Sequence, residues 1–190
     1  MARKVKYSDT KILNAAAQVV AASGVDGASV SQVAKRVGAP SGSVYHRYPS
    51  RKHLLGALWV RTLTSFYDGL DEATRDPGAD HLPQRCVDAV FDWTIGDPLA
   101  ATLLEKFRTE DLIENDWPAE VRVSIASQNQ RLADLTNRVA EARTINPLDA
   151  ILGVLDIPVA AARRAHDFDN DVVTGALRDR AVQLARQLLN

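Results

Sequence analysis

Short and polar side chains cluster between residues 41 and 48, in the run Ser-Gly-Ser-Val-Tyr-His-Arg-Tyr. On a helix, hydroxyl, phenol and imidazole groups can enter the major groove of DNA and contact base edges or phosphates. For His46 the alternative is an ordinary exposed histidine, and for Gly42 a small residue on a crowded helix. The candidate reading residues are Ser41, Gly42, Ser43, Tyr45 and His46.

The residues before this run have the spacing that two short helices joined by a tight turn require. Ala34 is small enough for the point where two steeply crossed helices approach, and Gly38 tolerates the positive φ of the turn. The pattern predicts a helix-turn-helix, with helices over 29–37 and 41–47 and Ser29 as the first N-cap. The apolar positions that pack against a preceding helix are Val33, Val37 and Val44.

Charge is distributed unevenly along the chain. Residues 1–53 hold nine Lys or Arg against two acids, a net charge of +7, although the whole chain has a net charge of -1. The remaining residues therefore have a net charge of -8. A basic module attached to an acidic body favours binding to a polyanion, and the alternative is chance clustering on a solvated surface.

Proline, glycine and capping residues divide the rest of the chain into segments with helical periodicity. An earlier helix ends near Gly24, and Pro49-Ser50 opens a long helix. Asp97-Pro98 and Asn146-Pro147 each pair a cap with a proline at the first helical position. Pro158 lies inside a continuing apolar stripe, so we expect it to kink that helix without ending it. The prediction is an all-α protein of about nine helices, divided into domains 1–50 and 51–190.

Composition excludes several classes of protein. A hydrophobic share of 46% over 190 residues is enough for a buried core, so a disordered chain is excluded. The single cysteine, Cys86, excludes an internal disulfide, and the histidines lack the spacing of metal ligands. We find no signal peptide, membrane span, catalytic motif or cofactor motif, and expect a cytoplasmic protein that is not an enzyme.

Residues 12–55 resemble the TetR family of bacterial transcriptional regulators. The resemblance rests on Gly27-Ala28-Ser29-Val30, on Val33-Ala34-x-x-Val37-Gly38, and on Gly42-Ser43-Val44-Tyr45-His46-x-Tyr48-Pro49-Ser50-Arg51. Pro40 stands where the family commonly has a capping Ser or Thr, so the third helix is expected to rely on Ser41 for its cap. Arg51 stands where lysine is usual, an exchange that a phosphate contact tolerates.

The resemblance implies that the third helix reads the major groove and that residues around it clamp phosphates. Tyr45 matches the phosphate-contacting tyrosine of the family, whereas Tyr48 is expected in the core. Helix N-termini attract phosphate, which makes Ser29, Ser31, Arg51 and Lys52 candidates. Near the N-terminus, Arg3 and Lys4 are candidates for a flexible arm on DNA, with a disordered tail as the alternative.

The resemblance also implies a homodimer and a pocket for a small effector. The expected dimer interface comprises Leu148, Ile151, Leu152, Leu155, Val173, Leu177, Leu184 and Leu188, and the alternative is burial of these side chains within one chain. The expected pocket residues are Trp59, Leu63, Phe66, Val90, Trp93, Leu104, Phe107 and Arg108, each of which has core packing as its alternative.

Together these observations predict a homodimeric repressor that binds an inverted-repeat operator in double-stranded DNA and is released by a small molecule. The alternative is an architectural DNA-binding protein that responds to no effector. A third possibility, a helix-turn-helix used only for protein packing, does not explain the +7 charge of residues 1–53.

Overall fold

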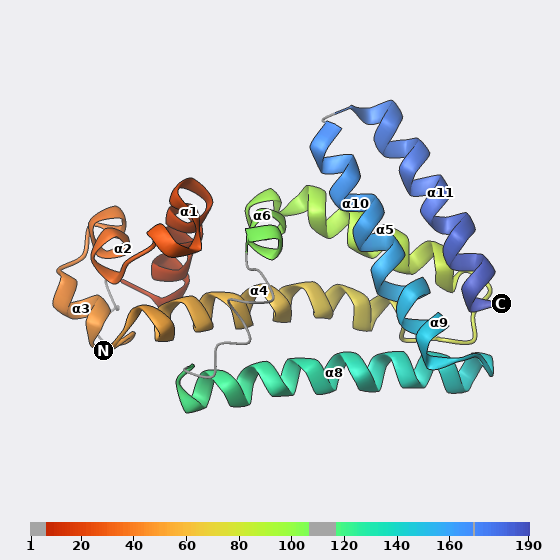
Figure 1. Cartoon of the computed structure of the whole chain (residues 1–190), viewed down its shortest axis with the longest axis horizontal. Helices are drawn as coiled ribbons and strands as arrows, with labels where there is room; N and C mark the ends of the chain where they lie inside the picture. Colours follow the sequence, from red (N-terminus) through yellow and green to blue (C-terminus); the bar gives the residue numbers. More distant parts are fainter. Residues whose placement is uncertain (1–6, 107–116, 169) are drawn as a thin grey trace, which may run out of the picture. The chain divides into compact units, whose positions relative to one another are not determined.

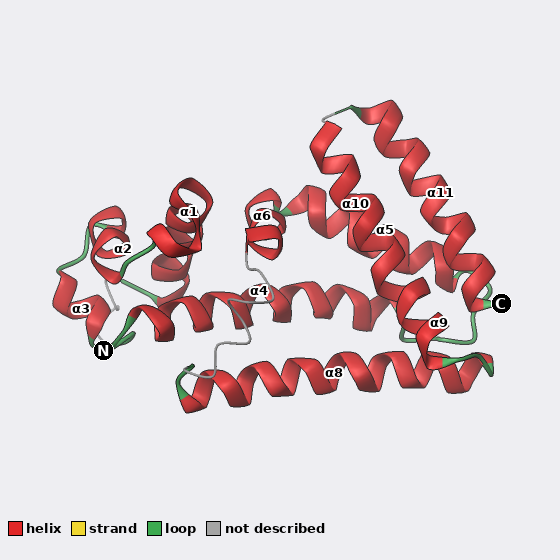
Figure 2. Cartoon of the chain, viewed as in Figure 1, coloured by secondary structure: helices red, strands yellow, loops and turns green. Residues whose placement is uncertain are grey.

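Every regular element in the described residues, 7–106, 117–168 and 170–190, is a helix, as the computed structural model shows (Figure 2). The all-α prediction is thereby confirmed. In chain order the elements are α1 (Asp9–Gly27), α2 (Val30–Val37), α3 (Ser41–Tyr45), α4 (Arg51–Ala73), α5 (Leu82–Gly96), α6 (Pro98–Lys106), α8 (Ala119–Arg143), α9 (Pro147–Ile151), the π-helical η1 (Leu152–Asp156), α10 (Ile157–Phe168) and α11 (Asp171–Leu189) (Figure 1).

Local capping residues bound α2 and begin α6 and α9 where the sequence predicts. The Ser29 hydroxyl accepts a hydrogen bond from the Gln32 amide (3.2 Å) and caps α2. Gly38 ends α2 in the left-handed conformation, with φ 70°. Asp97 and Asn146 accept bonds from backbone amides at the starts of α6 (2.9 Å) and α9 (2.8 Å). Side-chain oxygens that satisfy free amides at a helix start explain why these boundaries could be predicted.

Two expectations about the first three helices need adjustment. Gly24, expected to end the first helix, has φ 76° and breaks the regular helix, but a short helical stretch continues to Gly27. The prediction that Ser41 caps the third helix is wrong, because α3 begins after Pro40 without a side-chain cap. Instead the Ser43 amide donates to the Pro40 carbonyl (2.9 Å), and α3 ends at Tyr45, before Arg47.

The helix that contains Pro158 continues through the proline, as expected. The segment immediately before it, η1, is a π-helical turn between α9 and α10. Proline offers no amide hydrogen and clashes with the carbonyl four residues earlier, and a wider turn accommodates both effects. Gly153 lies in this turn, where a Cβ would come within 2.7 Å of the Leu189 side chain, so α11 packs closely on η1.

The described residues form two compact units, which do not divide at residue 50. The first consists of the described residues of Met1–Thr62 and Thr102–Ala126, and the second of those of Leu63–Ala101 and Ser127–Asn190. The long helices α4 and α8 each contribute residues to both units. In the first unit α2 packs on α1 and α3, and in the second α5, α10 and α11 pack on one another.

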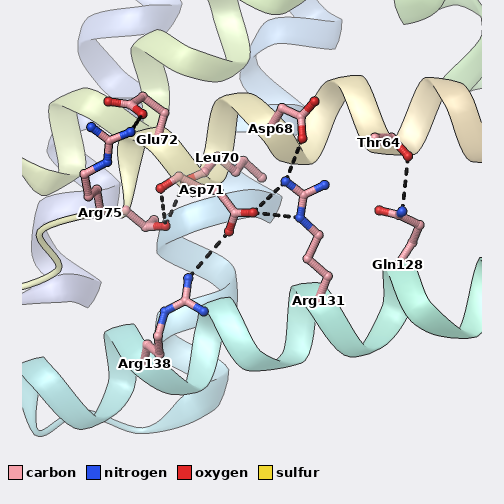
Figure 3. Close-up of polar contacts among 10 residues, drawn as sticks. Thr64, Asp68, Leu70, Asp71, Glu72, Arg75, Gln128, Arg131 and Arg138 are labelled. Carbon is pink, nitrogen blue, oxygen red and sulfur yellow. Dashed lines mark hydrogen bonds and ion pairs between the residues drawn. The ribbon is translucent and has the colours of Figure 1, made fainter.

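Ion pairs join α4 and α8 within the second unit (Figure 3). The Arg131 guanidinium on α8 contacts the carboxylates of Asp68 (2.7 Å) and Asp71 (2.6 Å) on α4. Arg138 approaches Asp71 from the next turns of α8 (3.5 Å), and the Gln128 amide donates to the Thr64 hydroxyl (3.1 Å). The two acids therefore share Arg131, Asp71 also meets Arg138, and these contacts hold the two helices in register.

Candidate nucleic-acid interface

Helix α3 presents a polar surface and buries a single apolar side chain. Val44 is fully buried, and α3 packs against α2. A Cβ added to Gly42 would meet no atom within 4 Å, so crowding inside the chain does not explain the glycine. The predicted reading residues all lie exposed: Ser41, Gly42, Ser43, Tyr45 and His46.

The start of α2 lies beside this surface. The hydroxyl oxygens of Ser31 on α2 and Tyr45 on α3 are 3.5 Å apart, and both side chains are exposed. Ser29 is half-buried and caps α2, while its hydroxyl also donates to the Gln32 side chain (2.9 Å). Two of the predicted phosphate contacts, Ser31 and Tyr45, are thus brought together, and Lys52 is partly exposed at the start of α4.

Tyr48 lies in the core of the first unit, as expected, and holds the start of α1. Its side chain is buried and its hydroxyl donates to the Asp9 carboxylate (3.4 Å). Arg47 pairs with the same carboxylate (3.2 Å). Burial, followed by the charge of Asp9 and the hydrogen bond to it, raises the pKa of Tyr48 to about 12.

This shift predicts a loss of stability in alkali that depends on Tyr48. Its pKa is higher in the folded chain than the ordinary 10.0, so the protonated phenol stabilises the fold below about pH 10. That contribution is lost as the pH rises through about 12. Urea unfolding followed between these pH values is expected to show a steeper decline for the unchanged chain than for Tyr48→Phe. Equal declines would contradict this role.

Arg51 is committed to the end of α1. Its guanidinium donates to the backbone carbonyls of Ala28 (2.8 Å) and Val25 (2.6 Å) and lies 3.6 Å from the Asp26 carboxylate. Both carbonyls follow the break at Gly24, and the Val25 carbonyl also accepts from the Ala28 amide (3.2 Å), so Arg51 adds a second donor to it. The structure therefore gives Arg51 a role in the fold, and its contact with phosphate stays a prediction.

Exchange of Arg51 for lysine tests that role. Lysine keeps the charge but cannot donate to two carbonyls in a fixed fork, so Arg51→Lys is expected to destabilise the chain by about 1–2 kcal/mol. The control is Lys52→Arg, which also conserves charge at the neighbouring position. Urea unfolding measures both variants. A purely phosphate-binding Arg51 would predict unchanged stability in both.

The predicted dimer residues form a partly uncovered face on α9, η1 and α11. Leu148 and Leu152 are exposed, with 69% and 39% of their surface accessible, and the other six are partly exposed. Burial of these side chains inside a single chain is therefore incomplete. The buried positions of the same helices are largely small residues that pack within the second unit, among them Ala150, Val154, Ala181 and Ala185.

The predicted pocket residues are distributed over both units. Trp59 and Leu104 belong to the first unit, and Leu63, Phe66, Val90 and Trp93 to the second. Within the second unit the rings of Phe66 and Trp93 meet edge to face, with centroids 5.0 Å apart, and the Trp93 ring nitrogen donates to Ser65 (3.1 Å). Their ligand contacts stay predictions. Arg3, Lys4, Phe107 and Arg108 lie outside the described residues.

Sequence patterns missed several contacts that position α3 and α4. The Tyr7 hydroxyl donates to the Gly38 carbonyl (2.9 Å) and joins the residues before α1 to the turn between α2 and α3. The His53 ring on α4 contacts the Ser50 hydroxyl (2.8 Å) and the Glu120 carboxylate (3.0 Å). Such contacts join residues far apart in the chain, so no local pattern predicts them. The position of Tyr7 directly after the basic N-terminal residues was the one sequence feature that could have pointed to its contact.

Other chemistry has limited support in the described part of the chain. Burial raises the pKa of the Cys86 thiol to about 12, so it stays protonated and weakly nucleophilic near neutral pH. No group of three or more His, Cys, Asp or Glu in these residues is arranged to hold a metal ion. No single described helix is long and apolar enough to cross a membrane. One pair of helices, Ala119–Arg143 with Pro147–Phe168, reaches that length and apolar character when taken together, and the pair is bent by 115°.

A protein-family match covers most of the three helices at the N-terminus. Residues 12–58 match the model of the bacterial regulatory proteins of the tetR family, a segment that begins inside α1 and ends within α4. It contains the exposed surface of α3 and the capped start of α2. No curated protein sequence matches the chain.

Solved structures of TetR regulators share the fold over nearly the whole chain. A tetR family transcription regulator from Shewanella sp. PV-4 superposes with a TM-score of 0.73 at 18% identity, covering 94% of this chain and 96% of its own. The fatty acid degradation regulator FadR of Bacillus halodurans gives 0.71 at 18% identity, covering 98% and 97%. FadR of Bacillus subtilis, solved with stearoyl-CoA, gives 0.68 at 18% identity, covering 94% and 97%.

Proposed function

We propose that this chain, a TetR-like transcription regulator by its domain over residues 12–58, is a homodimeric repressor released from an inverted-repeat operator by a small molecule. The exposed surface of α3 is the observation that carries the proposal. Five small or polar residues face solvent there around one buried valine, on a chain whose first 53 residues have a net charge of +7. This combination suits a helix that enters the major groove.

Binding to DNA is tested by titrating a fluorescent duplex with the full chain at several salt concentrations. Phosphate contacts release condensed counterions, so the logarithm of the affinity is expected to fall linearly with the logarithm of the salt concentration, by about 0.9 per phosphate. Binding that does not depend on salt, or no binding in low salt without added ligand, would contradict the proposal.

The dimer is proposed on the apolar face that includes Leu148 and Leu152. Two-fold symmetric proteins read inverted repeats, and one three-helix module reads few base pairs. The double variant Leu148→Glu with Leu152→Glu places two charges on this face, and like charges there meet across a symmetric interface. We expect it to be monomeric at micromolar concentration by analytical ultracentrifugation. Matched substitution of Val123→Glu, on an exposed position of α8, is expected to leave the mass unchanged.

Release by a small molecule is supported by the fold shared with FadR of Bacillus subtilis, which was solved in complex with stearoyl-CoA. A ligand that binds the released conformation more tightly lowers operator affinity by the ratio of its two affinities. The predicted pocket residues of the second unit, Leu63, Phe66, Val90 and Trp93, are proposed to contact it. Operator affinity that stays constant at saturating ligand would exclude this part of the proposal.

A further inference from the structure

A cavity of about 280 Å³ lies inside the second unit, between the end of α5, the end of α10 and the start of α11. We call it the α5–α10–α11 cavity. Its size is just below the range of roughly 300–1,000 Å³ that is usual for small-molecule pockets. None of the residues expected from the sequence to hold an effector lines it. The cavity is therefore distinct from the effector pocket that the sequence predicts.

One part of the cavity is apolar. Phe91 and Ile95 from α5 line it together with Ala162 and Ala165 from α10. Phe91 and the two alanines are buried, so they form a preformed wall. Ile95 is 60% exposed although it is a large apolar side chain, and covering it by a ligand would remove that apolar surface from water.

Three polar side chains that line the cavity have no partner among the described residues. They are the imidazole of His166, the carboxylate of Asp171 and the hydroxyl of Thr174. Other polar groups of the lining are already engaged, since Asn170 caps α11 and the Thr94 hydroxyl donates to the Val90 carbonyl (2.8 Å). A ligand would find acceptor atoms here in the Asp171 carboxylate, the Thr174 hydroxyl and a ring nitrogen of His166.

The charges decide which head group the cavity accepts. No lysine or arginine lines it, and Asp171 is the only acid among the lining residues. The nearby Arg178 is held by Asp92 (2.5 Å) and Asp88 (3.5 Å). The start of a helix normally attracts anions, but the Asp171 carboxylate in the first turn of α11 opposes them. An anionic head group would remain without a counter-charge.

We propose that the α5–α10–α11 cavity binds a small amphiphilic amine, with the ammonium group at Asp171, Thr174 and His166 and the apolar part against Phe91 and Ile95. A primary ammonium donates three hydrogen bonds, and the three free side chains supply three acceptors. The proposal of a binding site is supported by the cavity and its lining residues alone. Its action as the effector site rests on the proposed repressor function.

Three probes of one size and shape test the head group. Phenethylamine, phenethyl alcohol and phenylacetate share a ring and a short chain and differ mainly in charge. Isothermal titration calorimetry on the full chain is expected to give the amine at least about tenfold higher affinity than either other probe. Equal or tighter binding of the acid or the alcohol, or no binding of the amine, would overturn the proposal.

Substitution of Asp171 tests whether the amine binds at the cavity. Asp171→Asn keeps the shape and a residue that is favourable at a helix start, and it is expected to lower amine affinity about tenfold while leaving alcohol affinity unchanged. Asp179→Asn removes an exposed charge elsewhere on α11 and should change neither affinity. If both variants lose amine affinity equally, the effect is general attraction to an acidic surface and the proposal fails.

A parallel titration of operator duplex separates this proposal from the repressor function. Amine binding that requires Asp171 but leaves operator affinity unchanged supports the site and contradicts its action as an effector site. Operator binding with no amine binding overturns the site alone. Amine binding without any DNA binding supports the site and rejects the proposed repressor.

Discussion

Replacement of Ser43 by aspartate is expected to weaken operator binding by about 100-fold or more, because a base contact is worth about 1–3 kcal/mol and the new carboxylate repels phosphates. Ser43 is exposed on α3, two residues from the exposed Tyr45, so the variant should fold normally. Fluorescence anisotropy with the operator duplex measures the affinity, and thermal unfolding checks the fold.

The matched control is Ser127→Asp, which makes the same change on an exposed position of α8 in the second unit. It adds the same charge to the chain and is expected to change operator affinity by less than about threefold at moderate salt. Equal losses for the two variants would show that net charge, and not the surface of α3, determines binding. Unchanged affinity for Ser43→Asp would remove α3 from the interface.

Gly56→Leu is expected to destabilise the first unit by about 2–4 kcal/mol, with a corresponding loss of DNA binding. Gly56 lies inside α4, where a Cβ would come within 2.4 Å of a Val121 methyl group on α8. Valine is stiff at χ1 and cannot rotate away freely, so the helices must separate. Urea unfolding measures the loss.

Gly69→Leu provides the control within the same helix. A Cβ at Gly69 meets no atom within 4 Å, so leucine should be tolerated there and gain up to about 1 kcal/mol from its higher helix propensity. Adding Val121→Ala to Gly56→Leu should recover part of the lost stability by making room. If leucine destabilises the chain equally at Gly56 and Gly69, the close approach of Val121 is not the reason for the loss at Gly56.

Features that depend on neighbouring residues could be predicted from the sequence. Ser29, Gly38 and Asn146 act within four residues of their own position, through caps and a left-handed turn. The stripe that continues past Pro158 predicts a continuing helix, which η1 and α10 form. The absence of a cap at α3 could not be foreseen, because Ser41 is a good capping residue whose use depends on the backbone before it.

Long-range contacts could not be predicted because no local pattern records them. Arg51 reaches carbonyls 23 and 26 residues earlier, and the same side chain type would also suit a phosphate. The contact of Gly56 with Val121 joins residues that only the fold brings together. Likewise, His166 and Asp171 have no sequence motif, and their relation to Phe91 emerges only when α5, α10 and α11 pack around one cavity.

Selection of binding sites from a random duplex library tests the proposed operator binding most directly. The full chain, purified without added ligand, is incubated with the library at about physiological salt, where non-specific phosphate contacts are weakened. We expect enrichment of an inverted repeat whose half-sites are about one helical turn apart, and the Ser43→Asp variant should not enrich it. Salt-sensitive binding without any enriched sequence would contradict operator recognition and favour an architectural protein that coats DNA.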